Sequence, residues 1–303
     1  MKKNYPLWIG LFGLAVFQTA LFFRVEAVTT YFYSFIWWSY IVMIDGLIYH
    51  IRGNSLLINQ TRRFFLLIPW STAIWLVFEG FNLVLKNWYY IGLPKETILR
   101  WPGYFLAFGT VLPAILETKD LLSALGIFEK SRLTPMAVKK TWYRPMIIGG
   151  ALCLLLALLF PVICFPLVWL GFIFLLEPFN HQTGRLSLLK DLERGKPGTL
   201  YQLLVAGMIC GLLWEFWNFW ATAKWVYTVP WVGDLKLFEM PILGFLGFPP
   251  FALECYVLVH FLRLMEELPK KKDWLQWQIL VFCLLFYWLM FTAIDLNTVR
   301  SYG

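Results

Sequence analysis

Residues 200–222 read LYQLLVAGMICGLLWEFWNFWAT, a stretch in which Glu215 is the only charged side chain. About 20 consecutive apolar residues are enough for a helix to cross the hydrocarbon core of a bilayer. The stretch therefore predicts a transmembrane helix that carries one acid. A charge deep in such a helix costs about 2.5 to 3.5 kcal/mol on insertion scales, so it usually faces the protein interior and is often functional.

The whole chain has the same character. It contains 303 residues, of which 60% are hydrophobic, 19% aromatic and 15% charged, and its mean hydropathy is +0.65. Soluble domains carry about 25% charged residues, so this composition argues against a soluble enzyme and predicts an all-α integral membrane protein. The net charge of +8 does not indicate nucleic-acid binding, because the Lys and Arg residues lie between apolar runs.

Nine apolar runs give the predicted transmembrane helices. They lie near residues 6–23, 31–50, 64–85, 101–117, 145–160, 162–179, 200–222, 240–264 and 274–297. The run at 101–117 is short and reaches Glu117. The runs at 145–160 and 162–179 are separated by a short proline-containing stretch, so a re-entrant hairpin is an alternative there.

The distribution of positive charge predicts the orientation of these helices. With a cytoplasmic N-terminus, nine spans place 19 of the 26 Lys and Arg residues on the cytoplasmic side, where short loops are enriched in them. The seven on the other side are Arg24, Lys86, Lys95, Arg100, Lys224, Lys236 and Arg300. We therefore expect a protein of a bacterial cytoplasmic membrane with its N-terminus inside and its C-terminus outside.

The chain also matches itself at an offset of 132 to 137 residues. The aligned pairs are Trp37 with Trp169, Asp45 with Glu177, Ser55 with Ser187, Glu79 with Glu215, Asn82 with Asn218, Trp88 with Trp225, Tyr90 with Tyr227, and Glu117 with Glu254. Both parts of the chain carry three intramembrane acids and an Asn in the same order, and apolar composition alone does not easily produce such a match. We predict two tandem four-helix repeats, residues 1–137 and 138–268, followed by an additional helix in 269–303.

The repeats contain an even number of helices, so both enter the membrane from the same side and are related by a parallel pseudo-twofold axis. The first helix, which has features of a signal peptide, then corresponds to 145–160, and we expect it to be retained. Glu79 and Glu215 belong to the outer half of the bilayer on this topology, and the other acids lie nearer the inner side.

The acids are the candidate catalytic residues. Glu79 and Glu215 each precede an Asn by three residues, so Asn82 and Asn218 lie on the same helix face as the acids. A carboxyl shielded from water can hold its proton at neutral pH and serve as a proton donor. Alternatively, these carboxyls bind neighbouring Tyr, Trp or Asn groups and only join helices.

Aromatic residues are densest around Glu215. Trp214, Trp217 and Trp220 recur at every third position and are expected to line one side of the helix, and Trp225 and Tyr227 follow. These five residues are the candidate substrate-binding residues, since aromatic faces suit a flat or isoprenoid ligand or a cation. An ordinary aromatic belt at the membrane interface would explain part of this pattern.

No cofactor or metal site is expected. The five cysteines lack CxxC spacing, and His50, His181 and His260 are scattered. Motifs of serine hydrolases, zinc peptidases, nucleotide-binding loops and dinucleotide-binding folds are absent from the sequence. The remaining possibilities are acid–base catalysis without a cofactor and a protein that catalyses no reaction.

Residues 225–227, Trp-Val-Tyr, followed by Pro241-Ile-Leu-Gly-Phe-Leu-Gly-Phe248, resemble a pattern of the polytopic carotenoid hydratases. The duplicated helical architecture is similar to that of the membrane lycopene cyclases. The resemblance covers about residues 210–260 and, less closely, 75–120. This sequence departs from the patterns, since Gly244 replaces the hydratase Asn and Glu254 lies four residues beyond Pro250.

The resemblance implies an enzyme that protonates a C=C bond of a carotenoid or other isoprenoid lipid, after which the carbocation closes a ring or captures water. Glu215 would be the first-choice acid, Glu79 its equivalent and Glu254 the second choice, with Asn218 orienting the acid or a water and Trp214, Trp217 and Trp225 forming an aromatic wall. Two other functions remain open. One is a small-solute or lipid transporter or channel in which the acids relay protons, and the other is a lipid- or pigment-binding membrane protein without turnover. The oligomeric state is not predicted.

Overall fold

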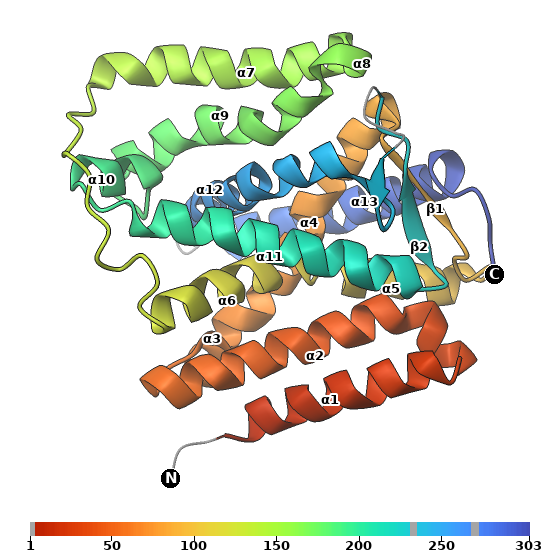
Figure 1. Ribbon diagram of the computed structural model, residues 1–303. Coiled ribbons are helices and arrows are strands. Elements are labelled where there is room, and N and C mark those ends of the chain that lie inside the picture. The colour runs from red at the N-terminus through yellow and green to blue at the C-terminus, as the bar shows by residue number, and fades with distance from the viewer. Residues whose placement is uncertain (1–3, 231–234, 268–272) are drawn as a thin grey trace.

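The computed structural model describes residues 4–230, 235–267 and 273–303, and it is almost entirely helical (Figure 1). Within these ranges, eight helical segments are long and apolar enough to cross a membrane. The prediction of an all-α protein with membrane-length helices is thereby confirmed. Of the 19 charges assigned to the cytoplasmic side, Lys2, Lys3, Lys270, Lys271 and Lys272 lie outside the described residues.

The chain runs through two series of elements in a similar order. The first series is α1 (Tyr5–Phe22), α2 (Glu26–Arg52), α3 (Leu56–Asn59), α4 (Thr61–Leu85), β1 (Trp88–Ile91), α5 (Thr97–Phe108) and α6 (Val111–Ala124). The second is α7 (Tyr143–Leu159), α8 (Pro161–Cys164), α9 (Val168–Gln182), α10 (Leu188–Glu193), α11 (Gly198–Trp220), β2 (Lys224–Tyr227), β3 (Lys236–Leu237), β4 (Met240–Pro241) and α12 (Phe248–Glu267), followed by α13 (Asp273–Asn297). Each series runs from two long helices through a short and a long helix to a strand.

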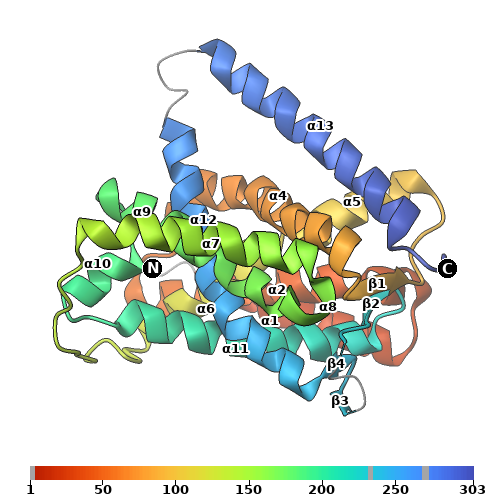
Figure 2. The same cartoon turned by 90° about the horizontal axis from the view of Figure 1, so that it is seen from above.

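The helices form a bundle with a central and a peripheral set. The core is built mainly by α2, α4, α6, α11 and α12, whereas α1, α7 and α13 lie at the periphery and have few buried residues. Figures 1 and 2 show α1 and α7 on opposite sides of the bundle and α13 along a third side. The start of α1 and the C-terminus lie at opposite ends of the bundle (Figure 1). The exposed apolar surface of the peripheral helices suits contact with lipid.

Glycines let α1 approach α2. A Cβ added to Gly10 would lie 2.3 Å from the backbone N of Met43, and one added to Gly46 would lie 2.1 Å from that of Leu7. Small residues at a helix crossing allow such close contact, which is a common basis of helix association in membranes.

The predicted helix at 101–117 is not continuous. The chain instead forms α5 and α6, which are separated at Gly109 and Thr110. Pro113 cannot donate a hydrogen bond to Gly109, and its ring disfavours a helix through that position. Ser71 of α4 compensates for the break, because its hydroxyl donates to the Phe108 carbonyl at 2.6 Å and accepts from the Leu112 N–H at 3.0 Å.

The region 145–179 forms two apolar helical segments. Segments Lys140–Leu159 and Pro161–Gln182 are each long and apolar enough to cross the membrane. The second segment contains α8, a 3₁₀ turn at Phe165–Leu167 and α9.

A two-stranded ribbon joins the two series of elements. Strands β1 and β2 are antiparallel, with Trp88 opposite Tyr227 and Tyr90 opposite Trp225. The C-terminal tail adds to the free side of β1, since the Tyr90 N–H donates to the Thr298 carbonyl at 2.8 Å and the Arg300 N–H donates to the Tyr90 carbonyl at 2.9 Å. The ribbon lies at the same end of the bundle as the C-terminus (Figure 1).

Candidate functional site

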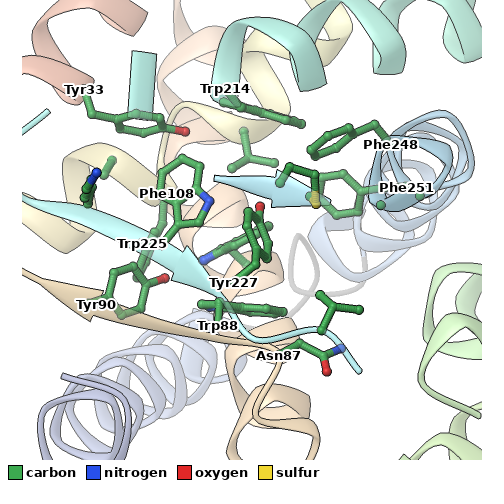
Figure 3. Close-up of a pocket in the computed structure, with 18 of the residues that line it drawn as sticks. Tyr33, Asn87, Trp88, Tyr90, Phe108, Trp214, Trp225, Tyr227, Phe248 and Phe251 are labelled. Atoms are coloured by element: carbon green, nitrogen blue, oxygen red, sulfur yellow. The ribbon is translucent and has the colours of Figure 1, made fainter. Parts of the chain in front are cut away.

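A cavity of about 510 Å³ lies beside the ribbon, between the two series of elements. Its wall combines residues of α2, α4, α5, α11 and α12 with both strands, and aromatic side chains dominate it. Figure 3 shows the ribbon side chains facing Phe248 and Phe251 of α12. The labelled lining residues are Tyr33, Asn87, Trp88, Tyr90, Phe108, Trp214, Trp225, Tyr227, Phe248 and Phe251. A concave, largely apolar pocket with a few polar groups is typical of a small-molecule site.

The cavity reaches the apolar surface of the bundle. Leu243 and Leu246 are among its lining residues and are 62% and 67% exposed. Both lie on the 3₁₀ helix Ile242–Gly247, which continues into α12 within a segment apolar enough to cross a membrane. One side of the cavity is therefore bordered by side chains positioned to meet lipid.

Glu79 is buried behind the wall of the cavity, with none of its surface exposed. Its Oε1 atom accepts hydrogen bonds from the indole N–H of Trp75 at 2.9 Å and of Trp88 at 3.0 Å, and from the Tyr90 hydroxyl. All three donor residues line the cavity. The carboxyl is thus separated from the cavity by one layer of aromatic side chains.

Glu215 has a related environment in the second series. It is also fully buried, and its Oε1 accepts a hydrogen bond from the Tyr227 hydroxyl at 2.9 Å. Tyr227 lines the cavity, whereas neither Glu215 nor Glu79 is part of the wall formed by the described residues. The structure therefore places each carboxyl in contact with a tyrosine of the ribbon, and these two strands are neighbours. We refer to Glu79 with Tyr90 and Glu215 with Tyr227 as the two Tyr–Glu pairs.

Asn82 and Asn218 hold the start of each strand. The Asn82 side chain accepts from the Trp88 N–H at 3.2 Å and donates to the Trp88 carbonyl at 2.9 Å. Asn218 makes the same two bonds with Trp225, at 3.0 and 2.8 Å. Both amides are fully buried. Their observed contacts are with backbone, so they position the strands that carry the Tyr–Glu pairs.

The phenols of these pairs stay protonated at neutral pH. Burial, reinforced by the charge of Glu79, raises the pKa of Tyr90 well above its ordinary value, and burial together with Glu215 does the same for Tyr227. Each hydroxyl can therefore donate a hydrogen bond or pass a proton between its carboxyl and the cavity. Such a relay is a means of general acid catalysis when the acid itself lies behind the wall.

The predicted binding residues do not all reach the cavity. Trp214, Trp225 and Tyr227 line it. Trp217 is buried against Trp37, with ring centroids 4.9 Å apart.

Trp220 does not share the burial of Trp214 and Trp217. Trp220 is 54% exposed, close to the end of α11.

The remaining acids lie outside this cavity. Glu254 is fully buried, and its Oε1 accepts the backbone N–H of Phe172 in α9 at 3.0 Å. Glu117 is buried beside the Asp45 carboxyl and interacts with it directly, and within residues 4–230, 235–267 and 273–303 no amide, indole or alcohol group donates a hydrogen bond to it. Within the described part of the chain, Glu254, the second-choice acid, therefore makes no hydrogen bond to a residue of the aromatic wall.

Asp45 and Glu177 share one structural pattern. Asp45 accepts the Ser55 hydroxyl at 2.8 Å and the Leu57 N–H at 2.7 Å. Glu177 accepts the Ser187 hydroxyl at 2.6 Å and the Leu189 N–H at 2.9 Å. Each acid thereby joins a long helix to the short helix that follows it.

A second polar cluster at the cavity was not predicted. Arg100 lines the cavity and forms a salt bridge with Asp295 of α13 at 2.6 Å, and Asp295 also accepts from Trp101 and Tyr104. The Arg100 guanidinium further donates to the carbonyls of Pro94 and Lys95. In the sequence, the only indication of this cluster was Asp295, a single acid near the end of an apolar helix. Its partner Arg100 lies 195 residues earlier in the chain, so sequence spacing does not connect the two residues.

No protein-family model, curated protein or solved structure matches this chain.

Proposed function

We propose that this protein binds an isoprenoid-type lipid in the aromatic cavity and protonates a C=C bond of that lipid without a cofactor. The observation that carries this proposal is the combination of an apolar cavity, bordered by exposed leucines, with two buried carboxyls that each contact a lining tyrosine. The leucine border would let a lipid enter sideways from the membrane. The aromatic wall would then surround its chain.

The proposed reaction begins with a protonated carboxyl of one Tyr–Glu pair. In this step the protonated carboxyl donates its proton to the phenol oxygen, which reverses the hydrogen bond seen between Tyr and Glu, and the phenol transfers its own proton to one carbon of the double bond. The π electrons form the new C–H bond, and the other carbon becomes a carbocation that the aromatic faces stabilise. Loss of a proton after ring closure, or capture of water with release of a proton, returns that proton to the carboxylate.

We propose in addition that the chain is a duplicated four-helix unit with one appended helix, spanning the membrane nine times with α5 and α6 together as one interrupted crossing. Three observations support this proposal. Asp45 and Glu177 make matching hydrogen bonds, and so do Asn82 and Asn218. The register of β1 and β2 is also reciprocal. A parallel pseudo-twofold axis would then pass through the ribbon. The cavity would lie between the two units, with one Tyr–Glu pair from each.

Transport is the weaker alternative for this cavity. A proton relay across the membrane would need a polar path from the ribbon to the other buried acids. The described lining residues include neither Asp45 nor Glu117, Glu177 or Glu254. Binding of a lipid without turnover would use the same cavity and differs only in the chemistry.

The proposed reaction is tested by incubating the purified protein with prenyl lipids in heavy water. Protonation at carbon leaves a deuterium that does not exchange back, so the lipid or its product gains one mass unit. Expression in a lycopene-accumulating host, with Glu215→Gln and Glu79→Gln as controls, tests the carotenoid substrate. Binding without deuterium incorporation by any prenyl lipid would contradict the catalytic part and leave a binding protein.

A further inference from the structure

The two Tyr–Glu pairs differ in how fully their carboxyls are bonded. Glu79 Oε1 accepts from two indoles and one phenol. Among the described residues, Glu215 Oε1 accepts only from Tyr227. The indole N–H of Trp225, which occupies the position of Trp88 in the ribbon, faces the Glu215 carboxyl but does not reach the hydrogen-bond geometry of the Trp88 bond.

A single substitution between the two halves accounts for one missing donor. Trp75 lies four residues before Glu79, and the residue four before Glu215 is Gly211. The space is taken by Phe248, since a Cβ on Gly211 would lie 2.2 Å from the Phe248 ring. A hydrogen-bond donor to the carboxyl in the first half is therefore replaced by an apolar ring in the second, and that ring lines the cavity.

The indole N–H groups of the wall are used differently in the two halves. Those of Trp75 and Trp88 are bonded to Glu79. Those of Trp214 and Trp225, both lining residues, have no partner at hydrogen-bond geometry in the part of the chain that the structure describes, although the Trp225 indole lies close to Glu215 and Tyr227. A buried donor without an acceptor is unfavourable, and a ligand that supplies an acceptor removes that cost.

We infer that the two Tyr–Glu pairs have separate duties: Glu79 anchors the ribbon, and the second half, with Trp214, Trp225, Tyr227 and Glu215, receives the polar end of the ligand. The ligand class is an isoprenoid lipid that carries one hydrogen-bond-accepting oxygen. Its hydrocarbon chain then lies against the first half, where the indole N–H groups face Glu79. This inference rests on the proposed function and deepens it, because it orients the ligand and selects Glu215 as the proton donor.

The test compares farnesol with farnesene, two prenyl chains of equal length with and without a hydroxyl. Binding to the full-length protein in nanodiscs is measured for wild type and for the matched variants Trp225→Phe and Trp88→Phe, which each keep an aromatic ring and remove one N–H. We expect wild type to prefer farnesol, and Trp225→Phe to lower farnesol affinity about threefold to tenfold, the range of one hydrogen bond. Farnesene binding should not change. Trp88→Phe should retain the preference and lower the thermal unfolding midpoint by at least about 2 °C.

A second matched pair, Glu79→Gln and Glu215→Gln, keeps the inference falsifiable if one indole variant fails to fold. Deuterium incorporation should be lost in Glu215→Gln and kept in the folded fraction of Glu79→Gln. Equal binding of both prenyl probes, or equal effects of the two indole variants on the preference, would overturn the inference while the proposed function stands. Binding of neither probe would contradict the proposed function itself.

Discussion

Trp88 and Tyr227 lie opposite each other in the ribbon, and the same register places Tyr90 opposite Trp225. Trp225 and Tyr227 follow Trp88 and Tyr90 by 137 residues, so one cross-strand pair is Trp opposite Tyr and the other is Tyr opposite Trp. An antiparallel pair of this kind is self-complementary, as in an isologous contact. The ribbon is thus the element through which both halves contribute to one cavity wall.

The buried asparagines should be strong determinants of stability. Asn82→Ala or Asn218→Ala removes the partners of a backbone N–H and a carbonyl at a strand start, and we expect each to cost about 1–3 kcal/mol. Asn297→Ala is the control, because this exposed side chain bonds only to a carbonyl within its own helix in the described structure. Denaturation in mild detergent measures the difference. A control as destabilised as the two variants would refute the assigned anchoring role.

The attachment of α13 should depend on Asp295. Its salt bridge with Arg100 is largely buried, with exposed side-chain fractions of 14% and 6%. Removing one partner of a buried pair leaves an uncompensated charge and costs about 3–5 kcal/mol. We expect Asp295→Ala to approach this loss in thermal or denaturant unfolding.

Asp120→Ala is the matched control for that prediction. Asp120 pairs with Lys119 at 2.8 Å but is 42% exposed, and exposed pairs contribute about 0–1 kcal/mol. Similar losses for Asp295→Ala and Asp120→Ala would show that the Arg100 cluster does not hold α13.

Close packing of α1 on α2 predicts sensitivity to a single methyl group. Gly46→Ala places a Cβ against the backbone of Leu7, so the helices must separate and we expect destabilisation of about 1–3 kcal/mol. Gly149→Ala in α7 is the control, since no atom of the described structure lies within 4 Å of its added Cβ. At position 149, alanine should leave the free energy of unfolding unchanged or raise it by up to about 1 kcal/mol. Gly46→Ala as stable as wild type would contradict the packing.

The leucine border of the cavity should control access by lipid. Leu246→Trp narrows the border without touching either Tyr–Glu pair, and we expect slower association and slower dissociation of farnesol from vesicles, with little change in the dissociation constant. Leu285→Trp on α13, a position that is 54% exposed, is the control. Stopped-flow quenching of tryptophan fluorescence measures both rates. Unchanged rates in Leu246→Trp would place the opening elsewhere.

Several features could be predicted from sequence because they depend on local composition. Apolar runs identify membrane-length helices, and an acid within such a run, such as Glu79 or Glu215, is expected to be buried. Both carboxyls are fully buried. The spacing of Glu and Asn also predicted a shared helix face, and both side chains of each pair contact the strand that follows.

Other features depend on distant partners, which periodicity does not reveal. The break between α5 and α6 is stabilised by Ser71 of another helix. Asp295 finds Arg100 only after the C-terminal helix folds back. Trp220 was expected among the binding residues because it follows Trp217 at the same spacing, whereas its position at the end of α11 leaves it exposed.

The central claim is that an isoprenoid chain binds inside the cavity and not on the outer surface. Photo-crosslinking with a farnesol analogue that carries a diazirine, followed by peptide mapping, tests it most directly in nanodiscs. We predict labels on lining residues from both halves, including Phe108 and Phe251, that unlabelled farnesol suppresses. Labels confined to exposed residues of α1, α7 and α13, insensitive to competition, would contradict the account.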